Sequence, residues 1–277
     1  MNNTLNIVKI ILLSVIAVAL VIILILLLNG KFNIKGFTLY EKTELVYEET
    51  YTENVENLKV LTTSNDVVIE EKETDSINVK VYDRKDAKPT SKVENNTLII
   101  ENKKEGTIGF SFGINGSSKI VISVPKNKEY NLDIEGTSSD VYSLINLKDV
   151  TITTKSGDID LKDSINTLIK TTSGDIKVEN VSKSLNATAT SGDITTGEIA
   201  GKLTLNTTSG DVSIKKLNLT NNSSIKVTSG DIVIGKTNDI YFDAHVTSGD
   251  IKINNNSRKA DVELKIKTTS GDITVNN

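Results

Sequence analysis

The sequence predicts an all-β protein: an elongated β-solenoid with repeats of about 17–22 residues, preceded by one transmembrane helix. A Ser-Gly-Asp-(Ile/Val) motif recurs seven times, and a unit of nearly fixed length indicates an array in which neighbouring repeats bury one another. Apolar or β-branched residues alternate with polar ones on both sides of each motif, as is typical of half-buried strands. A separate apolar run near the N-terminus predicts the helix.

The Gly and Asp of each motif are predicted to form the corners of the solenoid. Gly accepts the positive φ of a tight corner, and Ser and Asp can bond nearby backbone groups, so each unit is strand, corner, strand and return loop. The corner residues are Gly157, Asp158, Gly174, Asp175, Gly192, Asp193, Gly210, Asp211, Gly230, Asp231, Gly249, Asp250, Gly271 and Asp272.

Two degenerate corners fit the same register. In Ser64-Asn65-Asp66, Asn is expected to replace Gly because it tolerates positive φ. In Ser138-Ser139-Asp140, Ser takes that place. The long gap between Asp66 and Asp140 makes continuous stacking of these two coils an open question.

We divide the chain into four regions. They are residues 1–29, a tail with a membrane anchor; 30–54, a juxtamembrane linker; 55–130, an irregular β cap region; and 131–277, the repeat solenoid. Within the cap region, short strands are expected at 58–69, 77–82, 97–101 and 119–124.

The segment Ile10–Leu28 is apolar except for Ser14 and is long enough to cross a bilayer as a helix. It exceeds a usual signal-peptide core, and no Ala-x-Ala-like site follows, so we favour an uncleaved anchor over a cleaved signal. Flanking lysines are nearly balanced. A short leader before a large domain favours a single-pass protein of the cell membrane with an extracytoplasmic repeat domain.

Composition excludes several classes of function. The net charge is −4 and no basic block occurs, which argues against nucleic acid as a partner. The chain has no cysteine, so disulfides, thiolate metal sites and cysteine nucleophiles are excluded. Aromatic residues make up 4%, which suits a thin solenoid core better than a bulky globular one.

No residue pattern predicts a catalytic site or a cofactor site. Stacked corners would align carboxylates, and a calcium site at Asp158, Asp175, Asp193 and Asp211 is the alternative to a purely structural role for them. The single histidine, His245, is expected to face solvent. Phe110 and Phe112, in a Gly-rich patch of the diverse cap region, are the candidate binding surface.

The last motif lies five residues before Asn277, so the final coil is expected to leave a free strand edge. Either Lys265 and Lys267 on the preceding strand guard that edge, or it makes an end-to-end contact with another copy. Both alternatives remain open from the residues alone.

With this register, the chain resembles a bacterial family of β-strand-repeat proteins related to toast-rack domains, described as candidate adhesins of unknown function. The matching residues are the successive Thr-Ser-Gly-Asp-(Ile/Val) units and the segment Ile120–Lys126, a Val-Pro strand before the first repeats. The resemblance covers about residues 55–277. It implies a membrane-anchored envelope protein, in a family sometimes linked to envelope stress, with no established catalytic residues.

Three classes of function follow. The first is a non-enzymatic envelope module for adhesion or binding to an unknown protein or glycan. The second is a self-assembling membrane scaffold like the bactofilins. The third is a polysaccharide-active β-helix enzyme. We favour the first.

Overall fold

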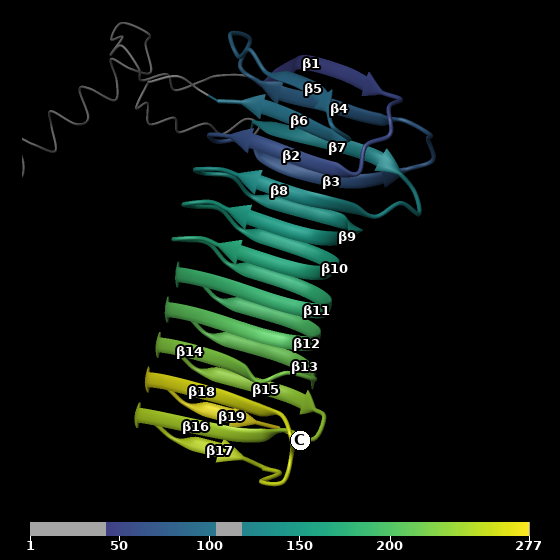
Figure 1. The fold of residues 1–277 in the computed structure, drawn as a ribbon. Coiled ribbons are helices and arrows are strands. Elements are labelled where there is room, and N and C mark those ends of the chain that lie inside the picture. Colours follow the sequence, from purple (N-terminus) through teal and green to yellow (C-terminus); the bar gives the residue numbers. More distant parts are fainter. Residues whose placement is uncertain (1–42, 104–117, 277) are drawn as a thin grey trace, which may run out of the picture. The chain divides into compact units, whose positions relative to one another are not determined.

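A computed structural model describes residues 43–103 and 118–276, which form nineteen strands and no helix (Figure 1). The predicted all-β solenoid is confirmed for these residues. The strands are β1 (Glu44–Tyr51), β2 (Asn57–Thr62), β3 (Asp66–Lys72), β4 (Ile77–Asp83), β5 (Thr90–Glu94), β6 (Thr97–Asn102), β7 (Lys119–Pro125), β8 (Tyr130–Glu135), β9 (Val141–Thr153), β10 (Ile159–Lys170), β11 (Ile176–Ser191), β12 (Ile194–Ser209), β13 (Val212–Leu219), β14 (Ser223–Ser229), β15 (Ile232–Thr237), β16 (Tyr241–Ser248), β17 (Ile251–Ile253), β18 (Glu263–Ser270) and β19 (Ile273–Val275). The predicted transmembrane segment Ile10–Leu28 lies outside the described residues.

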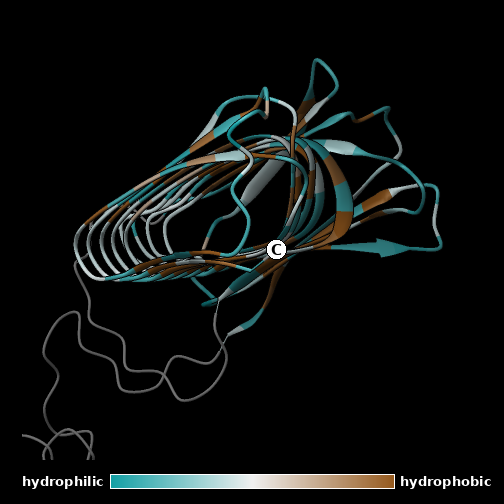
Figure 2. Ribbon diagram, turned by 90° about the horizontal axis from the view of Figure 1, so that it is seen from below, coloured by the Kyte–Doolittle hydropathy of each residue, from teal (hydrophilic) through white to brown (hydrophobic). Residues whose placement is uncertain are grey.

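The strands form two facing layers connected at the corners. Strands before the corners, such as β14 and β18, pair in one layer; strands after the corners, such as β15 and β19, pair in the other. The long strands β9 to β12 bend from one layer into the other, and adjacent coils pair in parallel along both halves. Seen along the stack, the coils superpose closely (Figure 2).

The narrow core lies between the layers and follows the predicted register. The residue after each corner Asp points inward, and Val67, Val141 and Ile159 align across adjacent coils. In stack order these residues are exposed by 0% at Val67, 0% at Val141, 1% at Ile159, 1% at Ile176, 0% at Ile194, 1% at Val212, 0% at Ile232 and 0% at Ile273. Ile251 differs, with 45% exposed, because its coil ends the stack.

Each of the seven literal motifs has its Gly at positive φ. At Gly192 the φ angle is +127°, and a Cβ atom would lie 2.2 Å from the carbonyl oxygen of Gly174 in the adjacent coil. The corner therefore requires Gly both for the backbone angle and for the close approach of adjacent coils.

The degenerate corners use a different backbone conformation. Asn65 is not at positive φ, so the expectation that it replaces Gly for that reason is wrong; among the described residues other than Gly, only Asn95, Asn96 and Asn127 have positive φ. Both Asn65 and Ser139 are buried, with 0% and 1% exposed. The coils nevertheless continue the stack, because β3 pairs in parallel with β9.

Stack order departs from chain order at the C-terminal end. Strand β18 pairs with β14 on one side and β16 on the other, while β19 lies between β15 and β17. The last coil in the sequence is thus second to last in space. Lys265 and Lys267 therefore lie on an interior strand, and the expectation that they guard a free edge is wrong.

The N-terminal end shows the same exchange. Strand β2 lies between β6 and β8, and β3 lies between β7 and β9. After β3 the chain adds a coil, β6–β7, on the outer side of β2–β3, and then returns to the inner side of β2–β3 at β8. Three antiparallel strands cover that coil: β5 pairs with β6, β4 with β7, and β1 with β4. The gap between Asp66 and Asp140 therefore does not interrupt the stack.

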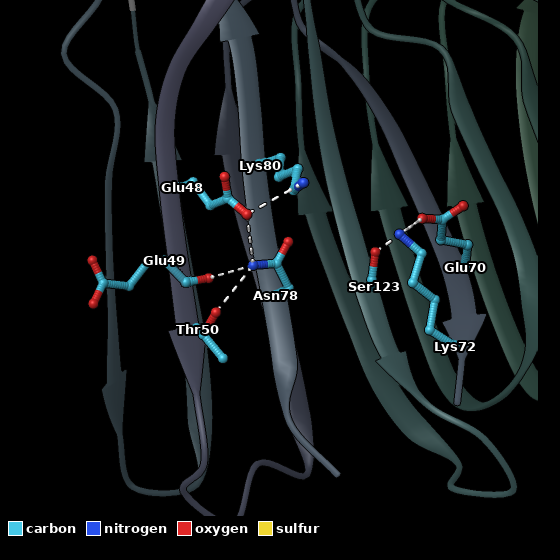
Figure 3. A network of polar contacts seen from close by, with 8 residues as sticks. All are labelled: Glu48, Glu49, Thr50, Glu70, Lys72, Asn78, Lys80 and Ser123. Atoms are coloured by element: carbon cyan, nitrogen blue, oxygen red, sulfur yellow. Dashed lines mark hydrogen bonds and ion pairs between the residues drawn. The ribbon is translucent and has the colours of Figure 1, made fainter. Parts of the chain in front are cut away.

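Polar side chains connect the outer surface of this cover (Figure 3). Asn78 of β4 donates from Nδ2 to Thr50 Oγ1 at 3.0 Å and to Glu48 Oε1 at 3.3 Å. On β3, Lys72 Nζ lies 2.8 Å from Glu70 Oε1, and this ammonium lowers the pKa of the Glu70 carboxyl. The Asn78 contacts fix β1 on β4 across an exposed face, whereas the Lys72–Glu70 pair lies within β3.

A buried carboxylate fastens the cover to the first corner. Asp83, at the end of β4, is 0% exposed and accepts from Asn65 Nδ2 at 3.0 Å and Asn102 Nδ2 at 2.7 Å. It also accepts from Ser118 Oγ at 2.9 Å and from the Arg84 N–H at 2.8 Å. A buried carboxylate needs such donors, because an unpaired charge away from water is costly. This explains the polar residue at position 65.

Candidate functional site

The corner aspartates form a continuous hydrogen-bonded column. Each carboxylate accepts the backbone N–H of the Asp in the next coil, so Asp158 N–H donates to Asp140 Oδ1 and Asp175 N–H to Asp158 Oδ1, both at 2.8 Å. In stack order the column is Asp66, Asp140, Asp158, Asp175, Asp193, Asp211, Asp231, Asp272 and Asp250. These bonds between side chain and backbone therefore connect adjacent coils at the corners, where the strand-to-strand hydrogen bonds are interrupted.

This column accounts for the predicted corner residues without a ligand. One carboxylate oxygen of each Asp except Asp250 is engaged with the adjacent coil, and the side chains from Asp158 onward are exposed. Within residues 43–103 and 118–276, no group of three or more His, Cys, Asp or Glu side chains could hold a metal ion. Calcium binding at Asp158, Asp175, Asp193 and Asp211 stays a hypothesis, tested below.

A buried threonine hydroxyl supports several corners, and sequence reasoning missed this role. Four residues before the corner Asp, Thr154 Oγ1 donates to the Ser156 carbonyl at 2.9 Å, and Thr171 Oγ1 to the Ser173 carbonyl at 3.1 Å. Thr207 and Thr268 make the same bond. The sequence shows this position as small or β-branched, and its preference for Thr was the available signal.

The other predicted residues contribute no assembled site. His245 is exposed on β16 between the partly buried Ala244 and Val246, facing outward as expected from strand parity. Phe110 and Phe112, the candidate binding surface, lie outside the described residues. No helix in the part of the chain that the structure describes is long and apolar enough to span a bilayer.

An exposed apolar patch, which the sequence analysis did not identify, lies on the outer face of β9. Leu144 is 64% exposed and Tyr142 is 38% exposed, two residues apart on the same side of the strand. Val68 of β3 pairs with Tyr142 and extends the patch into the neighbouring strand. Partial burial and the nearby Asp140 carboxylate raise the pKa of the Tyr142 phenol. We call Tyr142, Leu144 and Val68 the β9 patch.

Two adjoining cavities follow the return bends. The first, of about 600 Å³, is lined by polar and charged side chains, including Glu71, Lys128 and Lys148. The second, of about 450 Å³, shares Glu129 and Asn146 with the first and continues along the bends of β10 to β12. The second cavity also has apolar lining from Leu147, Ile165 and Val181.

The fold and the corner geometry define a toast-rack-type repeat domain. A family model described as Toastrack DUF4097 matches residues 55–276, so the chain belongs to this family. This confirms the resemblance seen in the motifs. No curated protein matches the chain.

Several solved structures resemble the chain at low identity. A candidate cell adhesion protein from Clostridium sporogenes is 13% identical over 85% of this chain and 99% of its own, with a TM-score of 0.28. A candidate lipid-binding protein from Parabacteroides distasonis is 16% identical over 84% and 94%, with a TM-score of 0.49. A candidate adhesin from Bacteroides fragilis is 14% identical over 82% and 96%, with a TM-score of 0.34. Similarity at this level carries no functional assignment.

Proposed function

We propose that this chain is a non-enzymatic, membrane-anchored module of the cell envelope that binds a protein partner through the β9 patch. The observation that carries the proposal is the exposure of Leu144, 64%, beside Tyr142 on an outer face whose other exposed residues are mostly polar. Neither side chain is needed to fill the core between the two layers. Exposed apolar residues that gather on one face are typical of interaction sites.

The scaffold supports this role by holding the patch rigidly. Tyr142 lies on β9, which pairs with β3 on one side and β10 on the other. The adjacent residues of the strand, Val141 and Ser143, point to its opposite face and are buried, with 0% and 2% exposed. A patch on a strand paired on both sides loses little conformational entropy on binding.

The chemistry of the patch favours a protein over a glycan. Tyr is enriched at protein interfaces because a large rigid ring combines apolar area with a hydroxyl. Leu144 adds an aliphatic surface that has no hydrogen-bonding capacity for a polyhydroxylated ligand. A partner with an apolar contact surface is therefore the better match.

Replacement of both patch residues tests this function. We expect Tyr142→Ser with Leu144→Ser to abolish a specific crosslinked product of the full-length chain in living cells, without lowering its melting temperature. The matched control is Val233→Ser, because Val233 is 42% exposed and lies on an outer strand face of β15. Crosslinked products unchanged in the double variant would disprove binding at the patch.

The anchor and its orientation are a separate part of the proposal. The apolar segment Ile10–Leu28 would hold the chain in the membrane, with the repeats on the extracytoplasmic side. Protease added to intact cells, with the outer membrane permeabilised where one is present, should then cleave the repeat domain. Cleavage only after lysis of the cytoplasmic membrane would place the repeats inside the cell and favour the self-assembling scaffold class.

A further inference from the structure

The last coil of the stack, formed by β16 and β17, lacks the contacts that each other coil makes with its successor. Elsewhere the corner Gly donates its N–H to a Ser carbonyl of the next coil, as Gly271 does to Ser248 at 3.0 Å. The residue after the Asp likewise donates to the next Asp carbonyl, as Ile273 does to Asp250 at 2.9 Å. Gly249 and Ile251 occupy these positions in the last coil, and no coil follows them.

Apolar and charged groups are exposed at the same place. Ile251 is 45% exposed, whereas Ile273, its counterpart in the preceding coil, is 0% exposed. Within the described part of the chain, the Asp250 carboxylate accepts no N–H, and neither Asp250 nor Lys252 forms an ion pair. We call Gly249–Ile253 the open edge.

The neighbouring edge of β16 is closed by a side chain at one residue, Phe242. Asn256 Oδ1 accepts the Phe242 N–H at 2.9 Å, and Asn256 Nδ2 donates to the Phe242 carbonyl at 3.0 Å. This amide takes the place of a pairing strand at Phe242. The opposite end of the stack is covered by the antiparallel strands β1, β4 and β5. Strands β1 and β5 are each paired on one side only at that end, but they carry no Ser-Gly-Asp corner that the last coil could match in a head-to-tail filament. At the C-terminal end of the stack, β17 is an edge where unpaired backbone groups lie beside the exposed Ile251.

We propose that the open edge pairs in antiparallel fashion with the same edge of a second copy, around a two-fold axis at Ile251. Backbone groups alternate along a strand, so the N–H and C=O of Ile251 point away from β19 and toward the partner. Ile251 then exchanges both hydrogen bonds with Ile251 of the second copy, and the Gly249 N–H meets the carbonyl of Ile253 of the second copy. The exposed Ile251 side chains cover each other.

Charge selects this register. With Ile251 opposite itself, Asp250 of each copy lies directly opposite Lys252 of the other, on the outer side of the sheet. Directly opposed residues have Cβ atoms about 4.5–5.5 Å apart, where opposite charges stabilise and like charges destabilise. A register shifted by one residue, centred on Lys252, would instead oppose the two lysines. The open edge is thus complementary to itself, as a two-fold interface requires.

The contact is short and is suited to chains concentrated in a membrane, so covalent trapping is the appropriate measurement. The chain has no cysteine, which leaves a clean background for Ile251→Cys. Paired residues that exchange hydrogen bonds have Cα atoms about 5.5 Å apart, within disulfide range. In membranes containing the full-length chain, mild oxidation should convert Ile251→Cys into a dimer. Val233→Cys, with a similar exposure of 42%, should stay monomeric.

A charge exchange tests the register. Added to Ile251→Cys, either Lys252→Glu or Asp250→Lys should lower the dimer yield by roughly fivefold, because two symmetric pairs become like-charged. The two changes together should restore it. The proposal is overturned by an Ile251→Cys yield no higher than that of Val233→Cys, or by a double exchange that fails to recover. Unchanged melting temperatures would show that the exposed substitutions leave the fold intact. Dimer formation is independent of the β9 patch, so Tyr142→Ser with Leu144→Ser should not affect it.

Discussion

At each literal corner, the Cα atom of Gly approaches the preceding coil so closely that no side chain fits. At the seven corners a hypothetical Cβ atom would lie 2.1–2.3 Å from a carbonyl oxygen of the neighbouring coil, which belongs to Ser139 for Gly157 and to the corner Gly in the other six cases. Positive φ adds a second restriction, since residues with a Cβ atom pay about 1–2 kcal/mol there. The invariance of Gly within the seven motifs thus has two independent causes.

A substitution in mid-stack should show both effects. Gly192→Ala is expected to lower the free energy of unfolding by about 2–4 kcal/mol, from backbone strain and overpacking together. Gly136→Ala is the control, because its Cβ atom would lie 3.1–3.6 Å from side-chain atoms of Ser139 and Thr154 rather than against backbone, and its φ is not positive. Urea unfolding of both variants measures the difference; equal losses would refute the dual requirement.

Some buried hydroxyls bond the backbone, and a few have no hydrogen-bond partner among the described residues. Thr196 Oγ1 points into the core with no hydrogen-bond partner, whereas Thr171 Oγ1 donates to the Ser173 carbonyl. An unpaired hydroxyl away from water is destabilising, and a paired one contributes about 1 kcal/mol.

The same substitution should therefore have opposite effects at the two sites. Thr196→Val should raise the free energy of unfolding by about 1 kcal/mol, and Thr171→Val should lower it by about 1 kcal/mol. The two changes are equal in volume, so each serves as the other's control. A shift in the same direction for both, in chemical denaturation, would contradict this account.

Tyr130 makes stability sensitive to high pH. Burial, assisted by the Glu71 charge, raises the pKa of its phenol to about 12. The unfolded chain loses this proton near pH 10, so it binds fewer protons than the folded chain between pH 10 and about 12, and stability falls as pH rises through that range. Below pH 10 the contribution is fully present.

Comparison with Tyr130→Phe isolates this effect from titrating lysines. We expect the melting temperature of the variant to fall less steeply with pH between about 10 and 12 than that of the unmodified chain. Parallel curves for the two proteins would show that Tyr130 is not the group responsible.

At the scale of elements, asparagine side chains take the place of strands where pairing is incomplete. Asn238 accepts the Leu219 N–H at 3.0 Å and donates to the Leu219 carbonyl at 2.8 Å, and Asn256 does the same for Phe242. A side-chain amide reproduces the donor and acceptor of a peptide group. These residues satisfy backbone groups at bends and at the last coil without an additional strand.

The exchanged order of the final coils predicts an unusual pattern of hydrogen exchange. β18 is nearer the C-terminus than β16 but is paired on both sides. We expect amides of β18 to exchange more slowly than those of β16, since opening β18 breaks two ladders. Mass-spectrometric or NMR exchange on the full chain measures this directly. Faster exchange in β18 would indicate coils stacked in chain order.

At the scale of the molecule, the Asp column connects every corner from Asp66 to Asp250. Each coil contacts only its neighbours, so stability is expected to be a sum of local interfaces rather than the product of one central core. The first corner-bearing coil of the sequence, β2–β3, and the last, β18–β19, each lie one position in from an end of the stack. Each of these two coils can therefore leave the stack only by breaking contacts on two sides.

This column should be insensitive to divalent cations. We expect neither EDTA nor added calcium to change the melting temperature, because one oxygen of each carboxylate except that of Asp250 already accepts a backbone N–H. A calcium-dependent rise, lost on substitution of Asp175 and Asp193 by Asn, would instead support the calcium hypothesis.

Local chemistry made much of this protein predictable from its residues. Alternation placed Ile159, Ile176 and their counterparts in the core, and the Gly-Asp pair marked the corners, because strand parity and backbone angles depend on adjacent residues. The sequence predicted that the Asp carboxylate accepts a hydrogen bond from a backbone N–H. It did not identify that N–H, because the donor belongs to another coil. The β9 patch was not predictable, because Tyr142 and Leu144 differ from other outward residues only in what surrounds them.

The order of the terminal coils depended on tertiary structure. Ala244 of β16 and Ile266 of β18 occupy the same position in their repeats, so the repeat pattern allows either of them to pair with Ile225 of β14. In the structure, Ile266 is the residue that pairs with Ile225. The repeats are interchangeable in backbone geometry, so the choice depends on how each coil closes the stack. Phe242 and Ile240 bury themselves at the end, at 3% and 1% exposed, and Asn256 closes the adjacent edge. Such contacts between distant segments have no counterpart in the repeat pattern.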